Sequence, residues 1–244
     1  MKLDARLSLF ITLVATFMTC LVVGDLIGGK LTSFHLFGRE WVFSVGQIAF
    51  PVTFILTDIL NEFYGRKVVR RVTFLAFAMV GLSFLIIYAA GALRWWPVAA
   101  QPDWPGVTPS QFESVFTQAT EIQLASMAAF LIANLVDIQV FFLFKRITRN
   151  RFLWLRATGS TAVSQLIDTI VISALVWRTK LSFGEYVTVV FTSYFIKVSI
   201  AILVTPIIYA LHELIEKKYG IPPAPAEVAS ADITGGTSGD AKRD

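Results

Sequence analysis

The chain has 244 residues, of which 55% are hydrophobic and only 16% are charged, and its mean hydropathy is +0.67. These values lie outside the usual range for a soluble domain of this length, so they predict a membrane protein. The formal net charge of +4 does not require a nucleic-acid partner, because basic loops beside a negatively charged lipid leaflet account for it.

Six apolar stretches are long enough to cross a bilayer, because about 20 helical residues span ~30 Å of hydrocarbon. In chain order they cover residues 7–27, 41–64, 72–93, 122–144, 159–177 and 185–211. Pro51 and Lys197 interrupt the second and the sixth stretch. The sequence therefore predicts an all-α integral membrane protein, with six transmembrane helices in a compact bundle within residues 1–219.

The segments that precede, connect and follow these spans predict the orientation of the protein. On the side of the N-terminus they carry thirteen Lys and Arg residues, against five on the opposite side, so the positive-inside rule places both termini in the cytoplasm. A short interfacial helix is expected at residues 112–116, in the loop after the third span. Residues 220–244, rich in Pro, Ala, Gly and Ser, are expected to form a disordered cytoplasmic tail.

The second span carries a polar face that lipid would penalise. Asp58, Asn61 and Glu62 occupy positions i, i+3 and i+4, which lie on one side of a helix. Such a face turns towards the protein interior or a water-filled cavity, so it predicts a gate or a polar path through the membrane. For Glu62 itself, a solvated salt bridge with Arg66 one turn later is the simpler expectation. Pro51 predicts a kink in the same helix.

Polar residues of the last three spans fall at a similar depth in the membrane. Asn134, Asp168 and Lys197 lie near the middle of their spans, and Asp137 and Gln165 lie within about one turn of that level. Each ionised group left facing lipid there would cost ~2.5–3.5 kcal/mol, so the charged residues must pair, be neutralised or line a cavity. A purely structural ion pair between Asp168 and Lys197 is one alternative, and a helix-bridging hydrogen bond is another for Asn134.

Signatures of enzymes and metal sites are absent from the sequence. Cys20 is the only cysteine, and His35 and His212 lie in different segments, so neither a disulfide framework nor a Cys/His metal cluster is expected. There is no Gly-rich phosphate loop, no His-Glu-x-x-His and no nucleophile elbow. We therefore expect neither an enzyme nor a bound cofactor.

Two sequence blocks resemble the queuosine precursor transporter family, which is also grouped with vitamin uptake transporters. The first block is Asp58-Ile-Leu-Asn-Glu-Phe-Tyr-Gly-Arg-Lys, followed by Arg70-Arg71. The second contains Asp137, Trp154-Leu-Arg and Ser164-Gln-x-x-Asp-Thr. One departure lies in the first span, where Asp25 stands at a place often occupied by Asn in the family and adds negative charge near the outer mouth.

The resemblance implies a multi-pass protein of the bacterial inner membrane. Its implied substrate is 7-cyano-7-deazaguanine or 7-aminomethyl-7-deazaguanine, used to make queuosine in tRNA and imported by alternating access, with or without proton coupling. Carboxylates can accept the N–H donors of a guanine-like edge, and amides suit its carbonyl and ring nitrogens. The substrate-binding residues predicted on this basis are Asn134, Asp137, Gln165 and Asp168. The predicted gate or polar path consists of Asp58, Asn61, Glu62, Lys197 and Asp25.

An alternative function is the substrate-binding membrane subunit of an ATP-driven vitamin uptake complex. In that case Ala15, Thr19 and Gly24 would supply a docking face of small residues on the first helix. The pattern Gly24-x-x-x-Gly28 would also suit a homodimer. A third class, a scaffold or enzyme that transports nothing, is disfavoured by the midplane charges and by the missing enzyme motifs.

Overall fold

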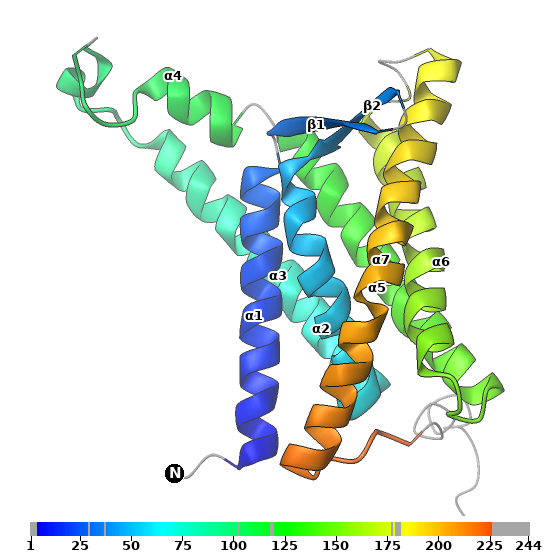
Figure 1. Cartoon of the computed structure of the whole chain (residues 1–244). Coiled ribbons are helices and arrows are strands. Elements are labelled where there is room, and N and C mark those ends of the chain that lie inside the picture. Colours follow the sequence, from blue (N-terminus) through cyan, green and yellow to red (C-terminus); the bar gives the residue numbers. More distant parts are fainter. Residues whose placement is uncertain are drawn as a thin grey trace, which may run out of the picture.

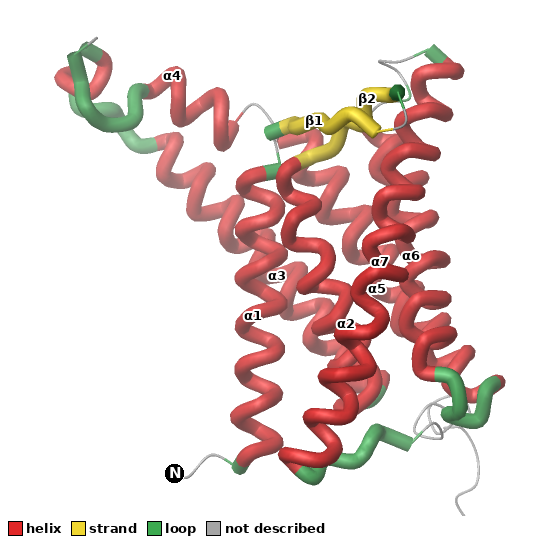
Figure 2. Tube along the Cα trace, in the orientation of Figure 1, coloured by secondary structure: helices red, strands yellow, loops and turns green. Residues whose placement is uncertain are grey.

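The computed structural model describes residues 4–28, 30–36, 38–101, 103–117, 120–176, 178 and 182–225. This part of the chain is mainly helical (Figures 1 and 2). In chain order the elements, with η marking short 3₁₀ or π turns, are α1 (Ala5–Ile27), β1 (Leu31–Leu36), β2 (Arg39–Ser44), η1 (Val45–Ala49), α2 (Phe50–Tyr64), α3 (Arg66–Ala92), η2 (Pro97–Ala100), α4 (Pro109–Phe112), η3 (Glu113–Thr117), α5 (Thr120–Ile147), α6 (Leu153–Val176) and α7 (Phe183–Tyr219).

Four helices of the described chain are long and apolar enough to cross a membrane. They are α1, α3, α7 and residues Leu124–Ile147 of α5. The protein is therefore a mostly helical, multi-pass membrane protein. The helix α2 has only 15 residues, and α6, with 24 residues, is not among these four helices.

The predicted second transmembrane helix is wrong over residues 41–49. Trp41 belongs to β2, which pairs antiparallel with β1 and places Trp41 opposite Phe34, with 6.4 Å between their ring centroids. The turn η1 follows, and α2 begins only at Phe50. Hydropathy does not distinguish an apolar strand from an apolar helix. The prediction therefore joined part of β2, η1 and α2 into one span.

The predicted kink at Pro51 is also wrong. Pro51 lies in the first turn of α2, where a backbone N–H would have no partner within the helix, so proline costs no hydrogen bond there. At the other end of α2, Gly65 has a φ of +80°, which favours glycine. Because α3 begins at Arg66, this one residue joins the two helices.

The central element of the bundle is α2. Ten of its 15 residues are buried, and it packs against α1, α3, α5 and α7 (Figure 1). Leu60 and Phe63 lie in the hydrophobic core together with Phe17 of α1 and Phe141 of α5. Because its neighbours cover α2, its polar side chains meet other helices instead of lipid.

A close approach between α1 and η1 depends on glycine. A Cβ atom added at Gly46 would lie only 2.4 Å from the carbonyl oxygen of Gly24 and 3.1 Å from Cα of Gly28. The Gly24-x-x-x-Gly28 pattern therefore packs within the chain. Ala15 and Thr19 are exposed whereas Gly24 is half-buried, so the three residues do not form one exposed face.

Two segments lie at the ends of the bundle. The C-terminal end of α3, η2 and α4 extend away from the other helices as an arm (Figure 1), and α4 with η3 coincides with the short helix expected at residues 112–116. At the opposite end, α7 ends at Tyr219 and is followed by Gly220. Ile221 is buried, and the N–H of Ala224 donates to the carbonyl oxygen of Glu62 at 2.7 Å. Residues 226–244 of the expected disordered tail lie outside the described residues.

Candidate functional site

A cavity of about 660 Å³ lies among α1, η1, α2, α5, α6 and α7. It extends from Gly28 and Phe43, at the hairpin end of the bundle, to Thr57 and Asp137, well inside α2 and α5. This volume is within the range of small-molecule sites, roughly 300–1,000 Å³. Six of the residues predicted from the sequence line it, namely Asp25, Asn134, Asp137, Gln165, Asp168 and Lys197.

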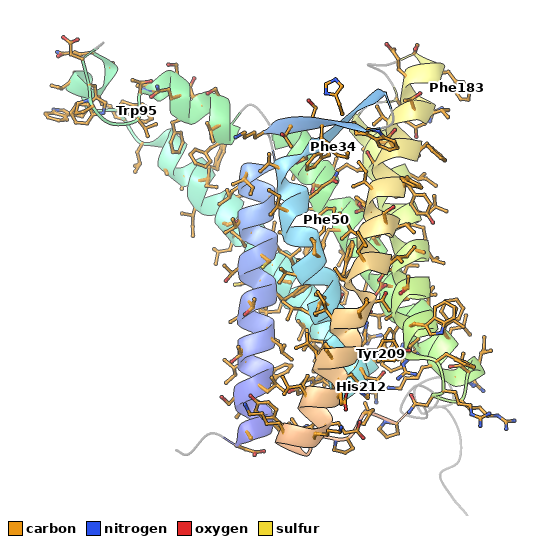
Figure 3. The ribbon with its side chains drawn as sticks, viewed as in Figure 1. Phe34, Phe50, Trp95, Phe183, Tyr209 and His212 are labelled. Atoms are coloured by element: carbon orange, nitrogen blue, oxygen red, sulfur yellow. The ribbon has the colours of Figure 1, made fainter. Side chains whose placement is uncertain are left out.

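Asp168 and Lys197 form an ion pair on the cavity wall. Lys197 Nζ of α7 lies 2.5 Å from Asp168 Oδ2 of α6 and 4.9 Å from the ring centroid of Phe50, which lies at the start of α2 (Figure 3). The side chain of Lys197 is 6% exposed and that of Asp168 is 15% exposed. The expected contact between the two charges is confirmed, and it ties α6 to α7 where an unpaired charge would be costly.

Asp137 joins three helices at the inner end of the cavity. Its Oδ1 accepts a hydrogen bond from Ser164 Oγ of α6 at 3.2 Å, and its Oδ2 accepts one from Asn61 Nδ2 of α2 at 3.4 Å. Asp137 is only 6% exposed, yet it lines the cavity. A carboxylate is thereby held in a fixed orientation at the deepest part of the cavity.

Asp25 lies on the α1 side of the cavity, towards the hairpin. Its Oδ1 accepts a hydrogen bond from Ser126 Oγ of α5 at 3.2 Å. With Asp137 and Asp168, it gives the cavity three carboxyl groups against the single ammonium group of Lys197. The described cavity residues therefore suit a ligand that offers several N–H donors.

Glu62 lies outside the cavity, in a buried cluster of charges between the cavity and the far end of the bundle. Arg156 of α6 donates from Nε to Glu62 Oε2 at 2.9 Å and from Nη2 to Oε1 at 2.8 Å, a bidentate arrangement. Lys145 Nζ of α5 lies 3.1 Å from Oε2, and His212 Nε2 of α7 lies 3.6 Å from Oε1. Phe34 of the hairpin and His212 mark opposite ends of the bundle in Figure 3. We call Glu62, Lys145, Arg156 and His212 the inner cluster.

The expected salt bridge between Glu62 and Arg66 is wrong. Arg66 Nη2 donates instead to Gln139 Oε1 of α5, while Glu62 is fully buried and faces three other helices. Sequence reasoning missed the roles of Lys145, Arg156 and His212. Lys145 and Arg156 were used only as signals of orientation, and His212 was considered only as a possible metal ligand. The one available signal was the place of Arg156 in the second block that resembles the transporter family.

Asp58 and Asn61 lie between the cavity and the inner cluster. Asp58 is 2% exposed and Asn61 is fully buried, and neither of them lines the cavity. Asn61 reaches it indirectly, through the hydrogen bond to Asp137. None of the three residues of the polar face predicted for the second span therefore lines the cavity, and Glu62 belongs to the inner cluster.

Comparison with known proteins identifies two relatives that are named as transporters. The chain is 29% identical over 174 residues to the "Probable queuosine precursor transporter" of Bacillus subtilis (strain 168), covering 70% of this chain and 72% of that protein. It is 27% identical over 161 residues to the "Queuosine precursor transporter" of Escherichia coli (strain K12), covering 65% of this chain and 67% of that protein. No solved structure matches the chain.

A family profile described as "Putative vitamin uptake transporter" matches residues 44–211. The matched range begins at the end of β2 and includes α2, α3, α5, α6 and most of α7. All the cavity residues predicted from the sequence except Asp25 lie within it, as does the whole inner cluster except His212. The chain therefore belongs to the putative vitamin uptake transporter family, and it is a membrane transporter and not an enzyme.

Proposed function

We propose that this protein imports a queuosine precursor, either 7-cyano-7-deazaguanine or 7-aminomethyl-7-deazaguanine, across the bacterial inner membrane. The observation that carries the proposal is the cavity itself, which is lined by carboxyl and amide groups of α5 and α6 and by aromatic side chains of α1 and α2. The printed names of the Bacillus subtilis and Escherichia coli relatives support the same class of substrate.

The cavity chemistry suits a flat guanine-like ring. The carboxylate of Asp137 or Asp168 accepts hydrogen bonds from adjacent ring N–H and amino groups, while the amides of Asn134 and Gln165 bind its carbonyl and ring nitrogens. Phe50 offers an aromatic face next to the ion pair. The excess of carboxyl groups also favours the cationic aminomethyl substituent over a neutral one.

The proposed topology has six spans, formed by α1, α2, α3, α5, α6 and α7, with both termini in the cytoplasm. At ~1.5 Å per residue, the 15 residues of α2 extend only ~22 Å. In this topology the turn η1 and the hairpin complete the span on the outer side, and Gly46 of η1 packs directly on the backbone of α1. The excess of Lys and Arg on the side of the N-terminus supports the orientation.

The difference between the two ends of the bundle supports alternating access as the proposed mechanism. The cavity extends towards the hairpin, while the inner cluster and the buried residues Leu60 and Phe63 close the opposite end. In the proposed cycle, substrate enters from the hairpin side. The inner cluster then separates so that the same residues become accessible from the cytoplasm.

Direct binding to purified protein tests the site. We expect both deazaguanines to bind the wild-type protein, and we expect Asp137→Asn and Gln165→Ala to weaken this binding at least tenfold. Glu213→Gln, which removes an exposed carboxyl group on α7, is the matched control and should bind as the wild type does. Wild-type affinity in Asp137→Asn and Gln165→Ala, with both variants correctly folded, would place the substrate elsewhere.

A further inference from the structure

Asp58 is a buried carboxyl group that belongs to neither the cavity wall nor the inner cluster. It is 2% exposed, and its Oδ1 has no hydrogen-bond partner among the described residues. One turn later on the same face, Asn61 is fully buried and its Oδ1 also lacks a donor. Buried polar atoms are nearly always hydrogen-bonded, so two unmatched acceptors on one helix face call for a physical explanation.

The charges around Asp58 distinguish it from the other carboxyl groups of α2 and α6. Glu62 has Lys145 and Arg156 as partners, and Asp168 has Lys197. No basic group of the described chain lies within 4.0 Å of the Asp58 carboxyl group. Asp58 is therefore held in the bundle interior without a counterion in contact.

Charged groups with described contacts lie on α2 and on the helices around it. They include Glu62 on α2, Asp25 on α1, Arg66 on α3, Asp137 and Lys145 on α5, Arg156 and Asp168 on α6, and Lys197 and His212 on α7. Those that act on Asp58 itself are Asp137, Glu62 and Arg156. Because Glu62 and Arg156 neutralise each other in the inner cluster, Asp137 is the charge whose effect on Asp58 is not offset.

We propose that Asp58 carries a proton between the cavity and the cytoplasmic side, and so couples substrate import to the proton gradient. When Asp58 is protonated, its O–H group can donate a hydrogen bond in a region where Asp58 Oδ1 and Asn61 Oδ1 are acceptors without a described donor. When Asp58 is ionised, both of its oxygen atoms are acceptors. Asp137 lines the cavity and is linked by Asn61 to the face of α2 that carries Asp58. The proton passes from the cavity through Asp137 to Asp58 Oδ1, and it leaves for cytoplasmic water when the inner cluster opens.

The proposal rests on the proposed function for the transported molecule, and the first test uses 7-cyano-7-deazaguanine because this compound carries no titrating amine. Vesicles that contain only the purified protein are assayed in two modes, namely exchange of labelled for unlabelled substrate and accumulation driven by a proton gradient. We expect Asp58→Asn to retain exchange within twofold of the wild type but to lose accumulation above equilibrium. Asp58→Glu should restore part of it, and Glu213→Gln should match the wild type.

Three transport results would overturn the proposal. The first is accumulation by Asp58→Asn at the wild-type level. The second is wild-type uptake that does not respond to a proton gradient, and the third is wild-type uptake that responds only to a sodium gradient. Exchange activity provides the check on folding, because a variant that still exchanges substrate must have an intact cavity.

A second test does not depend on the substrate. Infrared spectra of the wild-type protein in lipid near neutral pH should contain the carbonyl-stretch band of a protonated carboxyl group, which Asp58→Asn removes and Glu213→Gln leaves in place. If Asp58→Asn leaves the band unchanged, the proton site is wrong whatever the protein transports. If the band behaves as expected while neither deazaguanine is exchanged, the proton site stands and the proposed substrate fails.

Discussion

At the scale of single residues, Glu62 is the point where four helices meet. It lies on α2 and binds Lys145 of α5 and Arg156 of α6, with His212 of α7 beside it. The carbonyl oxygen of the same residue accepts the N–H of Ala224, so the segment after α7 is held there as well. One carboxylate thus fixes the relative positions of these helices at the end of the bundle opposite the hairpin, which is the property expected of the closed gate in the proposed cycle.

Replacing Glu62 by Gln should destabilise the protein strongly. Lys145 and Arg156 would remain buried without their counterion, and removing one partner of such a group costs about 3–5 kcal/mol. We expect a large fall in the thermal unfolding midpoint of the detergent-purified protein. Glu213→Gln, which disrupts the exposed contact with Lys217, should leave the midpoint unchanged. Equal effects of the two substitutions would mean that the inner cluster does not stabilise the bundle.

The pair Asp168–Lys197 can be tested for a structural or a binding role with a double substitution. Lys197→Met leaves the Asp168 carboxylate without its partner and should lower both thermal stability and affinity for the substrate. Lys197→Met combined with Asp168→Asn removes both charges, so thermal stability should recover while binding stays at least tenfold weaker. Recovery of binding as well would indicate that the pair only joins α6 to α7.

At the scale of elements, β2 and η1 line one end of the cavity, which we call the hairpin end. Phe43 of β2 and Gly46 of η1 line it, and Gly46 brings η1 against the backbone of α1. Trp41 of β2 also packs on α7, with its ring centroid 5.9 Å from that of Phe195. The hairpin and η1 therefore connect α1 to α7 at the hairpin end of the cavity, and their position should respond to any rearrangement of either helix.

Gly46→Ala should separate η1 from α1. The added Cβ would lie 2.4 Å from the Gly24 carbonyl oxygen, so the backbone must move at a cost on the order of 1–3 kcal/mol. We expect a lower unfolding midpoint and weaker substrate binding. Gly184→Ala is the matched control, because a Cβ there meets no atom within 4 Å. Loss of stability in Gly184→Ala but not in Gly46→Ala would contradict this packing.

At the scale of the whole molecule, the sequence correctly predicted a helical membrane protein with polar side chains in its interior. Apart from the pair Asp168–Lys197, it did not predict which of these side chains contact one another. Asp137, Gln165 and Asp168 were predicted to lie close together because they fall at a similar depth in the membrane, and all three line the same cavity. The partners of Glu62 were not predictable in this way, because contacts between α2, α5, α6 and α7 depend on how the helices pack. The hairpin was missed because a short apolar strand has the same hydropathy as a helix.

The proposed topology of the whole chain can be measured by cysteine labelling. After replacement of Cys20 by Ser, Arg149→Cys places a single thiol in the exposed turn between α5 and α6, and Arg94→Cys places one after α3. Six spans with a cytoplasmic N-terminus predict that an impermeant reagent added outside intact cells labels Arg94→Cys alone. External labelling of Arg149→Cys would contradict the proposed orientation.

The most direct test of the central claim is exchange of labelled 7-cyano-7-deazaguanine or 7-aminomethyl-7-deazaguanine by the purified protein alone in lipid vesicles. The proposed transporter predicts rapid exchange of at least one of these compounds by the wild-type protein, loss of this exchange in Asp137→Asn, and no exchange in vesicles without protein. Binding without exchange would point to a subunit that needs an energising partner. Absence of both binding and exchange, in protein shown to be folded, would contradict the proposed substrate.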